Sequence, residues 1–266
     1  MPRNPGRYHQ LIERVFLSRY ADTVREISFT REELIATADD LDIKLPKNPG
    51  DVLYTYRYRR DMPESVASKA PEGEFWIILP DGASKYRFFA TPFSTVIPTV
   101  GMTETKIPDA TPGIIAMHAK SDEQALLAKL RYNRLIDIFT GVTCYSLQSH
   151  FRTQVRRMGQ VETDELYIGI DRRGAQYVFP VQAKGGKDRL SVVQVLQDVE
   201  VGAEKFPTLI CRPIAAQFMA NDLIALFDFE IGTDGLKLAT EKHFRLVPPE
   251  QMTSEDLAVY RDRPVT

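Results

Sequence analysis

The segment QVETDELYIGIDRRGAQYVFPVQAKGGKD, residues 160–188, decides the fold. Two apolar runs, 162–170 and 176–184, flank the short polar sequence Asp171-Arg172-Arg173-Gly174. Strand-like runs on either side of a glycine-containing turn are typical of a β-hairpin. With the turn centred near Arg173, the numbers of paired residues sum to about 346 or 348. The segment therefore predicts two antiparallel strands in a defined register.

Four polar residues of this hairpin have even numbers, namely Glu162, Asp164, Gln182 and Lys184. Because side chains alternate along a strand, all four are expected on one face. Opposite residues lie about 5 Å apart, so two carboxylates, an amide and an ammonium are expected together. Carboxylate and carbonyl oxygens suit a hard cation such as Mg²⁺, which polarises a phosphoryl oxygen and acidifies bound water. The lysine would position that water or stabilise developing negative charge.

Helices and further strands are expected on both sides of the hairpin. Apolar periodicity and turn residues predict, in chain order, a helix over 121–141, a strand over about 142–155, the hairpin, a helix over about 189–204, and strands over about 208–218, 222–230 and 243–247. Up to residue 230 the order is α, β, β, β, α, β, β, with the short strand near 243–247 after it, which predicts a mixed sheet in an α/β (α+β) domain.

In these residues the chain resembles the PD-(D/E)XK nucleases, which include most type II restriction endonucleases. Their core is αβββαβ, with an acid on the second strand and (D/E)-X-K on the third. Asp164 and Gln182-Ala183-Lys184 occupy these places. Gln182 departs from the usual acid, but Mrr-like restriction nucleases carry the same D…QxK variant. The resemblance implies a restriction-endonuclease-like fold and catalytic roles for Asp164, Gln182 and Lys184.

The resemblance also implies how a metal would be bound. Mg²⁺, with Mn²⁺ as a substitute, would be held by Asp164, the Gln182 side-chain oxygen, the Ala183 carbonyl and Glu162, which would replace the charge that Gln182 lacks. A metal-bound water would attack the phosphodiester of double-stranded DNA, and cutting both strands implies a homodimer. No nucleotide cofactor is implied.

Two alternatives stay open for the hairpin. A one-residue bulge would exchange Asp164 for Glu165 as the acid on the second strand. Lys184 would otherwise form an ion pair with Asp164 or Glu162 that only stabilises the strand end. Gln194, on the following helix, is a weaker candidate for facing the site.

The first hundred residues predict a separate DNA-reading module. Helical periodicity over 7–20, a capping box from Thr30 to Glu33 and a helix start at Asn48-Pro49 precede a hairpin over 74–91. Three helices followed by a hairpin are the order of a winged-helix module, whose third helix would carry Arg57 and Arg60 to DNA.

Further basic residues are expected to contact DNA from the nuclease domain. Arg152 lies on the first core strand, and Lys187 lies near the start of the second helix. Lys187 can equally be a solvated charge in a turn. The expected domains are a winged-helix-like module (1–95), a Pro-rich connection (96–120), the nuclease domain (121–250) and a C-terminal tail (251–266).

Composition limits the classes of protein that the chain can belong to. The 266 residues carry 34 basic and 36 acidic side chains, yet residues 151–190 hold eight basic and five acidic ones. The sequence contains no uninterrupted apolar stretch of about 18 residues, so no membrane span is predicted. Two isolated cysteines and an N-terminus without an apolar leader predict a cytoplasmic protein. Beside restriction-type cleavage, the sequence leaves open a DNA repair or recombination nuclease and a non-catalytic DNA-binding regulator.

Overall fold

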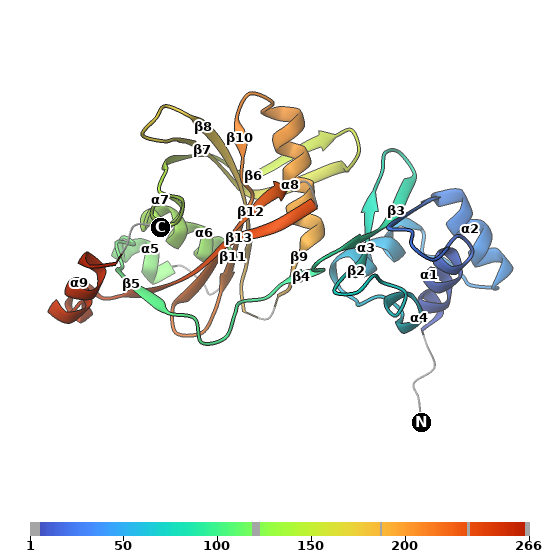
Figure 1. The fold of residues 1–266 in the computed structure, drawn as a ribbon, viewed down its shortest axis with the longest axis horizontal. Coiled ribbons are helices and arrows are strands. Elements are labelled where there is room, and N and C mark those ends of the chain that lie inside the picture. The colour runs from blue at the N-terminus through green and yellow to red at the C-terminus, as the bar shows by residue number, and fades with distance from the viewer. Residues whose placement is uncertain (1–5, 119–122, 187, 233–234, 264–266) are drawn as a thin grey trace.

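The computed structural model describes residues 6–118, 123–186, 188–232 and 235–263. It is a mixed α/β structure in two parts, an N-terminal module and a core built on a large sheet (Figure 1). The predicted fold class, mixed α and β with a mixed sheet, is confirmed at this level.

The N-terminal module combines short helices with a small antiparallel sheet in the order β1-β3-β2. Its elements are α1 (Arg7–Leu17), β1 (Glu26–Thr30), α2 (Arg31–Asp40), α3 (Gly50–Tyr58), α4 (Glu64–Ala67), β2 (Phe75–Pro80) and β3 (Lys85–Thr91). The predicted capping box is confirmed, because Thr30 and Glu33 each bond the other's backbone N–H. Strand β1 was not predicted. Buried and exposed residues alternate along it. It has only five residues, however, and it ends at the helix cap Thr30, so the sequence shows little strand periodicity there.

Residues 96–120 are more than a connection. After β4 (Thr95–Val96), this part of the chain forms β5 (Glu104–Pro108) and α5 (Gly113–His118). Strand β5 pairs in parallel with a strand near the C-terminus and forms one edge of the large sheet. The segment predicted as a Pro-rich connection thus also contains an edge strand of the large sheet, a place where proline is tolerated.

The core consists of a sheet with helices on both faces. In chain order it contains α6 (Glu123–Tyr132), α7 (Leu135–Thr140), β6 (Thr143–Val155), β7 (Gly159–Ile170), β8 (Gln176–Lys184), β9 (Leu190–Ser191), α8 (Val192–Lys205), β10 (Ile210–Cys211), β11 (Ile214–Phe218), β12 (Leu223–Gly232), β13 (Gly235–Val247), a 3-10 turn (Pro249–Gln251) and α9 (Ser254–Arg261). The strand order is β5-β13-β12-β11-β8-β7-β6, with β10 beside β8. Strand β11 runs parallel to β8, and β6, β7 and β8 are antiparallel.

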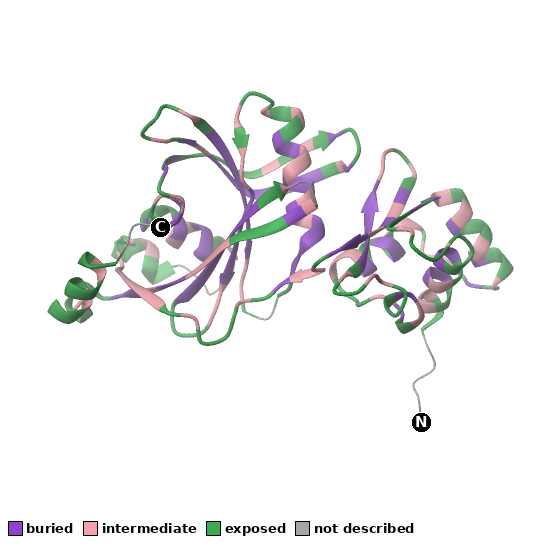
Figure 2. Ribbon diagram, in the orientation of Figure 1, coloured by how far each residue is buried: buried purple, intermediate pink, exposed green. Residues whose placement is uncertain are grey.

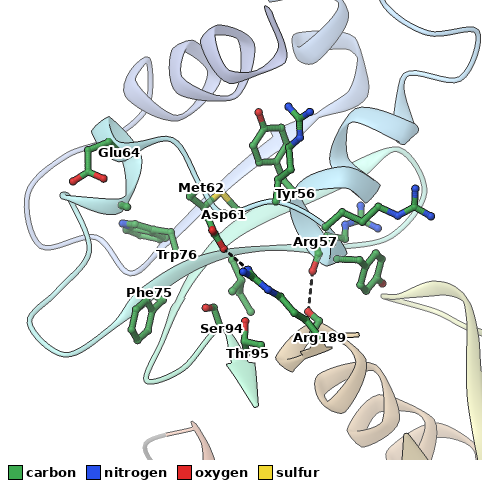
Figure 3. A pocket seen from close by; sticks show the side chains of 16 residues that line it. Tyr56, Arg57, Asp61, Met62, Glu64, Phe75, Trp76, Ser94, Thr95 and Arg189 are labelled. Atoms are coloured by element: carbon green, nitrogen blue, oxygen red, sulfur yellow. Dashed lines mark hydrogen bonds and ion pairs between the residues drawn. The ribbon is translucent and has the colours of Figure 1, made fainter. Parts of the chain in front are cut away.

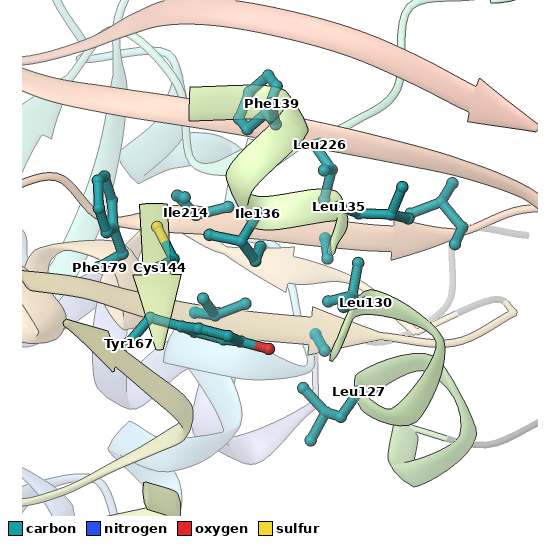
Figure 4. Packing of buried hydrophobic residues seen from close by; sticks show 14 of the residues in the cluster. Leu127, Leu130, Leu135, Ile136, Phe139, Cys144, Tyr167, Phe179, Ile214 and Leu226 are labelled. Carbon is teal, nitrogen blue, oxygen red and sulfur yellow. The ribbon is translucent and has the colours of Figure 1, made fainter. Parts of the chain in front are cut away.

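Each face of this sheet has its own apolar core. Helices α6 and α7 cover one face, where Leu130, Ile136 and Phe139 pack against Phe179 and Ile214 (Figure 4). Helix α8 covers the other face. Buried residues follow the central strands, so the sheet is the scaffold of the core (Figure 2). No helix in the described ranges has both the length and the apolar character to cross a membrane.

Helix α8 also joins the two parts of the molecule. Val192 and Val195 of α8 share one apolar cluster with Ile77 and Leu79 of β2. At the same boundary β4 pairs with β9, and the Val192 N–H donates to the Ser94 carbonyl at 3.1 Å. The N-terminal module is therefore packed onto α8, the helix that follows the 160–188 segment.

Helix α3, the predicted DNA-reading helix, lies at this boundary (Figure 1). The Tyr58 hydroxyl donates to Gln197 Oε1 of α8 at 3.3 Å, and the Ser191 hydroxyl donates to the Arg57 carbonyl at 2.8 Å. The C-terminal half of α3 is thus in contact with the core, and its side chains there line the junction.

Candidate functional site

The hairpin formed by β7 and β8 has the predicted register. Pairs run from Ile170–Gln176 to Glu165–Val181, and each pair of numbers sums to 346, for example 165 with 181. The prediction is confirmed, because the Asp171–Gly174 turn fixes the register. The regular pairing ends at Glu165, the residue that follows Asp164 in the chain.

Side-chain alternation along β7 breaks at Asp164. Glu165 contacts Arg131 of α6, whereas Thr163 donates a hydrogen bond to Asp198 of α8. Residues two apart in a regular strand share a face, so these opposite contacts require an irregularity between them. Opposite it on β6, His150 has a positive φ of 49°. Asp164 therefore leaves the ladder, and its carboxylate accepts the Ala183 N–H at 2.8 Å.

The Lys184 ammonium lies among three oxygen acceptors at the end of β8. Lys184 Nζ is 2.9 Å from the Ala183 carbonyl, 3.1 Å from Glu123 Oε2 and 3.5 Å from Asp164 Oδ2. Of the predicted cluster, Asp164, Ala183 and Lys184 are brought together. Glu123, the first residue of α6, completes the group from outside the hairpin.

The charges of this group shift each other's pKa values. Burial raises the pKa of Asp164 to about 6, against the opposing effects of Lys184 and the Ala183 N–H. Burial by itself would lower the pKa of Lys184, but Asp164 and Glu123 outweigh it, and the pKa is raised. Lys184 thus stays protonated near neutral pH while Asp164 titrates close to it, as is common at functional sites.

Gln182 belongs to a separate buried network on the α8 side. Its Nε2 donates to Asp198 Oδ2 at 2.9 Å and to the Glu162 carbonyl at 3.2 Å, and its Oε1 accepts from Gln194 Nε2 at 3.0 Å. Burial raises the pKa of Asp198 to about 7, opposed by hydrogen bonds from Thr163 and Gln182. The amide is therefore directed at α8, where Asp198 also senses the charges of Asp164 and Lys184.

The Glu162 side chain does not join the group, so the prediction that all four polar side chains gather was wrong. Glu162 accepts from Arg152 Nε at 3.0 Å and pairs with His150 Nδ1 at 3.1 Å. The irregularity at Asp164 is the physical reason, because it moves Glu162 out of phase with the rest of β7. Only the Glu162 backbone carbonyl reaches Gln182.

The two candidates for the acid on the second strand have different surroundings. Asp164 contacts Ala183 and Lys184. Glu165 is fully buried on the α6 side, where it accepts from Arg131 Nε at 2.9 Å and from the Ser146 hydroxyl at 2.6 Å. Geometry therefore favours Asp164 as the functional carboxylate.

The oxygens around Lys184 suit a hard divalent cation. Asp164, Glu123 and the Ala183 carbonyl already converge on one positive charge, and Mg²⁺ commonly uses one or two carboxylates with several waters. Gln182 Oε1 already accepts from Gln194, so it would offer a cation only its second lone pair. Across the described residues, no group of three or more His, Cys, Asp or Glu side chains is arranged to hold a metal. A cation would therefore depend on two carboxylates, a carbonyl and water.

The predicted DNA contacts lie in varied surroundings. Arg57 is half-buried, with its guanidinium 5.3 Å from the Tyr86 ring centroid, and desolvation lowers its pKa. Arg60 is exposed just beyond α3. Arg152 is exposed and paired with Glu162. Lys187 lies outside the described residues. Arg57 is therefore poorly placed for a DNA groove, whereas Arg60 and Arg152 remain accessible.

Two residues of the site were missed from the sequence, Glu123 and Asp198. Asp198 lies four residues after Gln194, so one helix face carries both, and an acid on the apolar side of α8 was a usable signal. Glu123 gave no comparable signal in the sequence, since acidic residues are common in the first turn of a helix.

Comparison with protein-family models, with curated proteins and with solved structures found no match to this chain. The chemistry of the site is therefore assigned from its own geometry.

Proposed function

We propose that this chain is a Mg²⁺-dependent DNA endonuclease of the type II restriction kind. One observation carries the proposal: the Lys184 ammonium is held against Asp164, Glu123 and the Ala183 carbonyl at the end of β8. Phosphodiester hydrolysis needs a cation site beside a group that stabilises developing charge, and this cluster supplies both kinds of group.

The order of elements supports the proposal. Elements α6, β6, β7, β8, α8 and β11 follow one another in the αβββαβ order of the PD-(D/E)XK core, with short elements between them. In the N-terminal module the order α1, β1, α2, α3, β2, β3, with sheet order β1-β3-β2, supports a winged-helix-like arrangement. Together they favour a DNA substrate over other phosphodiesters.

Each residue of the site has a defined task in this proposal. Asp164, Glu123 and the Ala183 carbonyl would hold Mg²⁺, which when bound polarises the phosphoryl oxygen and acidifies a water molecule. Lys184 is displaced from these oxygens and donates to the phosphoryl group, where it stabilises the developing negative charge. Gln182, fixed by Asp198 and Gln194, positions the end of β8.

Plasmid cleavage tests the proposal directly. The purified chain should cut supercoiled plasmid with Mg²⁺ or Mn²⁺ and not with EDTA. Asp164→Asn should abolish cutting, whereas the matched control Asp40→Asn, an exposed carboxylate at the end of α2, should cut like the wild type. Discrete fragments would identify site-specific restriction, and nicks at branched or damaged DNA would identify a repair nuclease.

A failure to cut has a clear meaning. If the wild type binds DNA yet leaves it intact with both metals, the nuclease proposal is wrong and a non-catalytic DNA-binding regulator takes its place. Cutting both strands further requires two sites, so we propose a homodimer, which sedimentation of the protein with and without duplex DNA would detect.

A further inference from the structure

A two-part groove lies between the N-terminal module and the core. The smaller part has a volume of about 310 Å³ and adjoins α3, and the larger part has about 790 Å³. Both parts share the side chains of Asp61, Phe75, Ser94, Thr95 and Arg189. Volumes of this size are typical of small-molecule sites. Each part is thus large enough for a ligand, and the two parts adjoin along these shared side chains.

The smaller part combines positive charge with aromatic rings. Arg57, Arg59, Arg60 and Arg189 line it together with the acids Asp61 and Glu64, which leaves an excess of positive charge. Phe75 lines it with 52% of its surface exposed, and the buried Trp76 lies beside it. An exposed ring beside arginines suits a ligand with a flat aromatic part and an anionic part.

Arg189 extends from the core across the groove towards Asp61, with Phe75 and Trp76 on the opposite wall (Figure 3). Arg189 Nη1 and Asp61 Oδ1 are 3.0 Å apart, and both side chains are mostly exposed. An exposed ion pair of this kind contributes little to stability, whereas a phosphate offers arginine a stronger bidentate partner. Arg189 is therefore available to an anionic ligand.

Two buried donors in the wall of the smaller part lack an acceptor. Arg57 Nε and Trp76 Nε1 have no hydrogen-bond partner among the described residues. Buried donors without partners are uncommon in native structures and call for an explanation. Both atoms are shielded from the open groove, so the groups that a ligand can reach directly are the exposed Phe75 and Arg189.

The larger part of the groove leads to the end of β8. Its lining includes Gly186 and Asp188, from the loop after Lys184, and Gln217, whose Cα pairs with that of Lys184 between β11 and β8. A chain lying in the groove would thus pass from α3 towards the Lys184 cluster.

We propose that this groove binds a nucleotide unit, with the base stacked on Phe75 beside Trp76 and the phosphate on Arg189. The identification of the ligand as part of a DNA strand rests on the proposed function. Nucleotide binding in the groove does not depend on that function. The nucleotide belongs to an unpaired or extruded part of the strand, since a stacked pair would not enter a pocket of this size.

The only tryptophan in the sequence, Trp76, reports on this site. The full chain, kept in EDTA to prevent cutting, is titrated with oligothymidine, a duplex oligonucleotide, thymidine monophosphate, thymidine and inorganic phosphate. We expect saturable quenching of Trp76 by oligothymidine. Quenching by thymidine monophosphate as well would identify a free nucleotide as a second source of the same ligand.

Variants separate the groove from the rest of the surface. Phe75→Leu, which keeps apolar bulk but removes the ring, and Arg189→Gln should each weaken binding about tenfold. The matched controls Tyr145→Ala, an exposed ring on β6, and Arg172→Gln, in the β7–β8 turn, should bind like the wild type. Circular dichroism and melting curves confirm that each variant is folded.

Three results would overturn the proposal: no quenching by any nucleotide or oligonucleotide, equal quenching by inorganic phosphate alone, or unchanged affinity in both groove variants. These measurements need no cleavage, so they test the groove separately from the nuclease proposal. The chain can cut plasmid without binding nucleotides in the groove, and it can bind nucleotides there without cutting DNA.

Discussion

Gln182 donates a hydrogen bond from Nε2 to the buried carboxylate of Asp198, at 2.9 Å. Asp198 is 1% exposed and has no cation among its hydrogen-bond partners in the described residues. An acid at position 182 would place two carboxylates in contact inside the protein, where like charges are costly. The structure thus gives a physical reason for glutamine at this point of the motif.

Gln182→Glu should therefore destabilise the protein, on the order of 2–4 kcal/mol near neutral pH. Adding Asp198→Asn should restore most of the lost stability, because an asparagine amide can donate to the new carboxylate. Urea unfolding of the two single variants and the double variant gives the coupling free energy. Additive effects of the two substitutions would contradict direct contact between these side chains.

The stability of the wild type should fall as pH rises from about 4 to about 7. Burial raises the pKa of Asp198 to about 7, so the folded state binds this proton more tightly than the unfolded chain does. Its contribution is fully present below the unfolded pKa near 3.8 and is lost as pH rises through the folded value. Asp198→Asn should flatten the pH profile of the urea midpoint, while Asp164, with a pKa raised to about 6, should leave a smaller slope of the same sign. An unchanged profile in the variant would refute this assignment.

Asp164→Asn and Glu165→Gln should have opposite consequences. Asp164→Asn should abolish cleavage with a melting temperature close to that of the wild type. Glu165→Gln should lower the melting temperature, because the fully buried side chain loses the charge that faces Arg131. The cost should stay below the roughly 3 kcal/mol of a fully buried pair, since the Arg131 side chain is 42% exposed. Thermal melts and plasmid cleavage of both variants decide between the two acids, and the reverse outcome would make Glu165 the functional carboxylate.

Lys184→Ala should reduce the rate of cleavage by a factor on the order of 10²–10³. DNA affinity should change little, since the lysine contacts Asp164, Glu123 and its neighbour's carbonyl and lies away from the arginines of the groove. Gel shifts in EDTA and cleavage in Mg²⁺ measure the two effects. Equal losses of binding and cleavage would assign Lys184 to binding instead.

Gly202→Ala should destabilise α8 against β10. A Cβ built at Gly202 would lie 2.6 Å from the Cβ of Cys211 and closer still to its Sγ. Overpacking of this kind costs about 1–3 kcal/mol. Urea unfolding measures the loss, and Gly174→Ala, in a turn with open space around it, provides a contrast in which only the positive φ is unfavourable. Wild-type stability of Gly202→Ala would mean that α8 is free to move away from β10.

The sequence was sufficient for the hairpin because the Asp171–Gly174 turn and the alternation of apolar residues specify the same register. The departure at Asp164 could not be predicted, because it depends on His150 of β6 and on two helices that hold Thr163 and Glu165 on opposite faces. Local pattern assigns a residue to a face only while the strand stays regular.

The two ends of the core contain more secondary structure than the sequence predicts, for a different reason. The segment predicted as a tail contains α9, which begins with a capping box formed by Thr253 and Asp256. Strand β5 carries no comparable signal, since it is a short edge strand whose partner, β13, lies more than a hundred residues later. Pairing over such a distance is a property of the folded sheet.

The β4–β9 ladder connects the groove to the site. Ser94 borders the groove and its carbonyl accepts the N–H of Val192 at the start of α8, the helix whose Gln194 donates to the Gln182 amide. If the proposed ligand binds more tightly when this ladder is intact, it would favour the ordered amide, and the ordered amide would favour the ligand by the same factor. The boundary between the two parts would then transmit free energy in both directions.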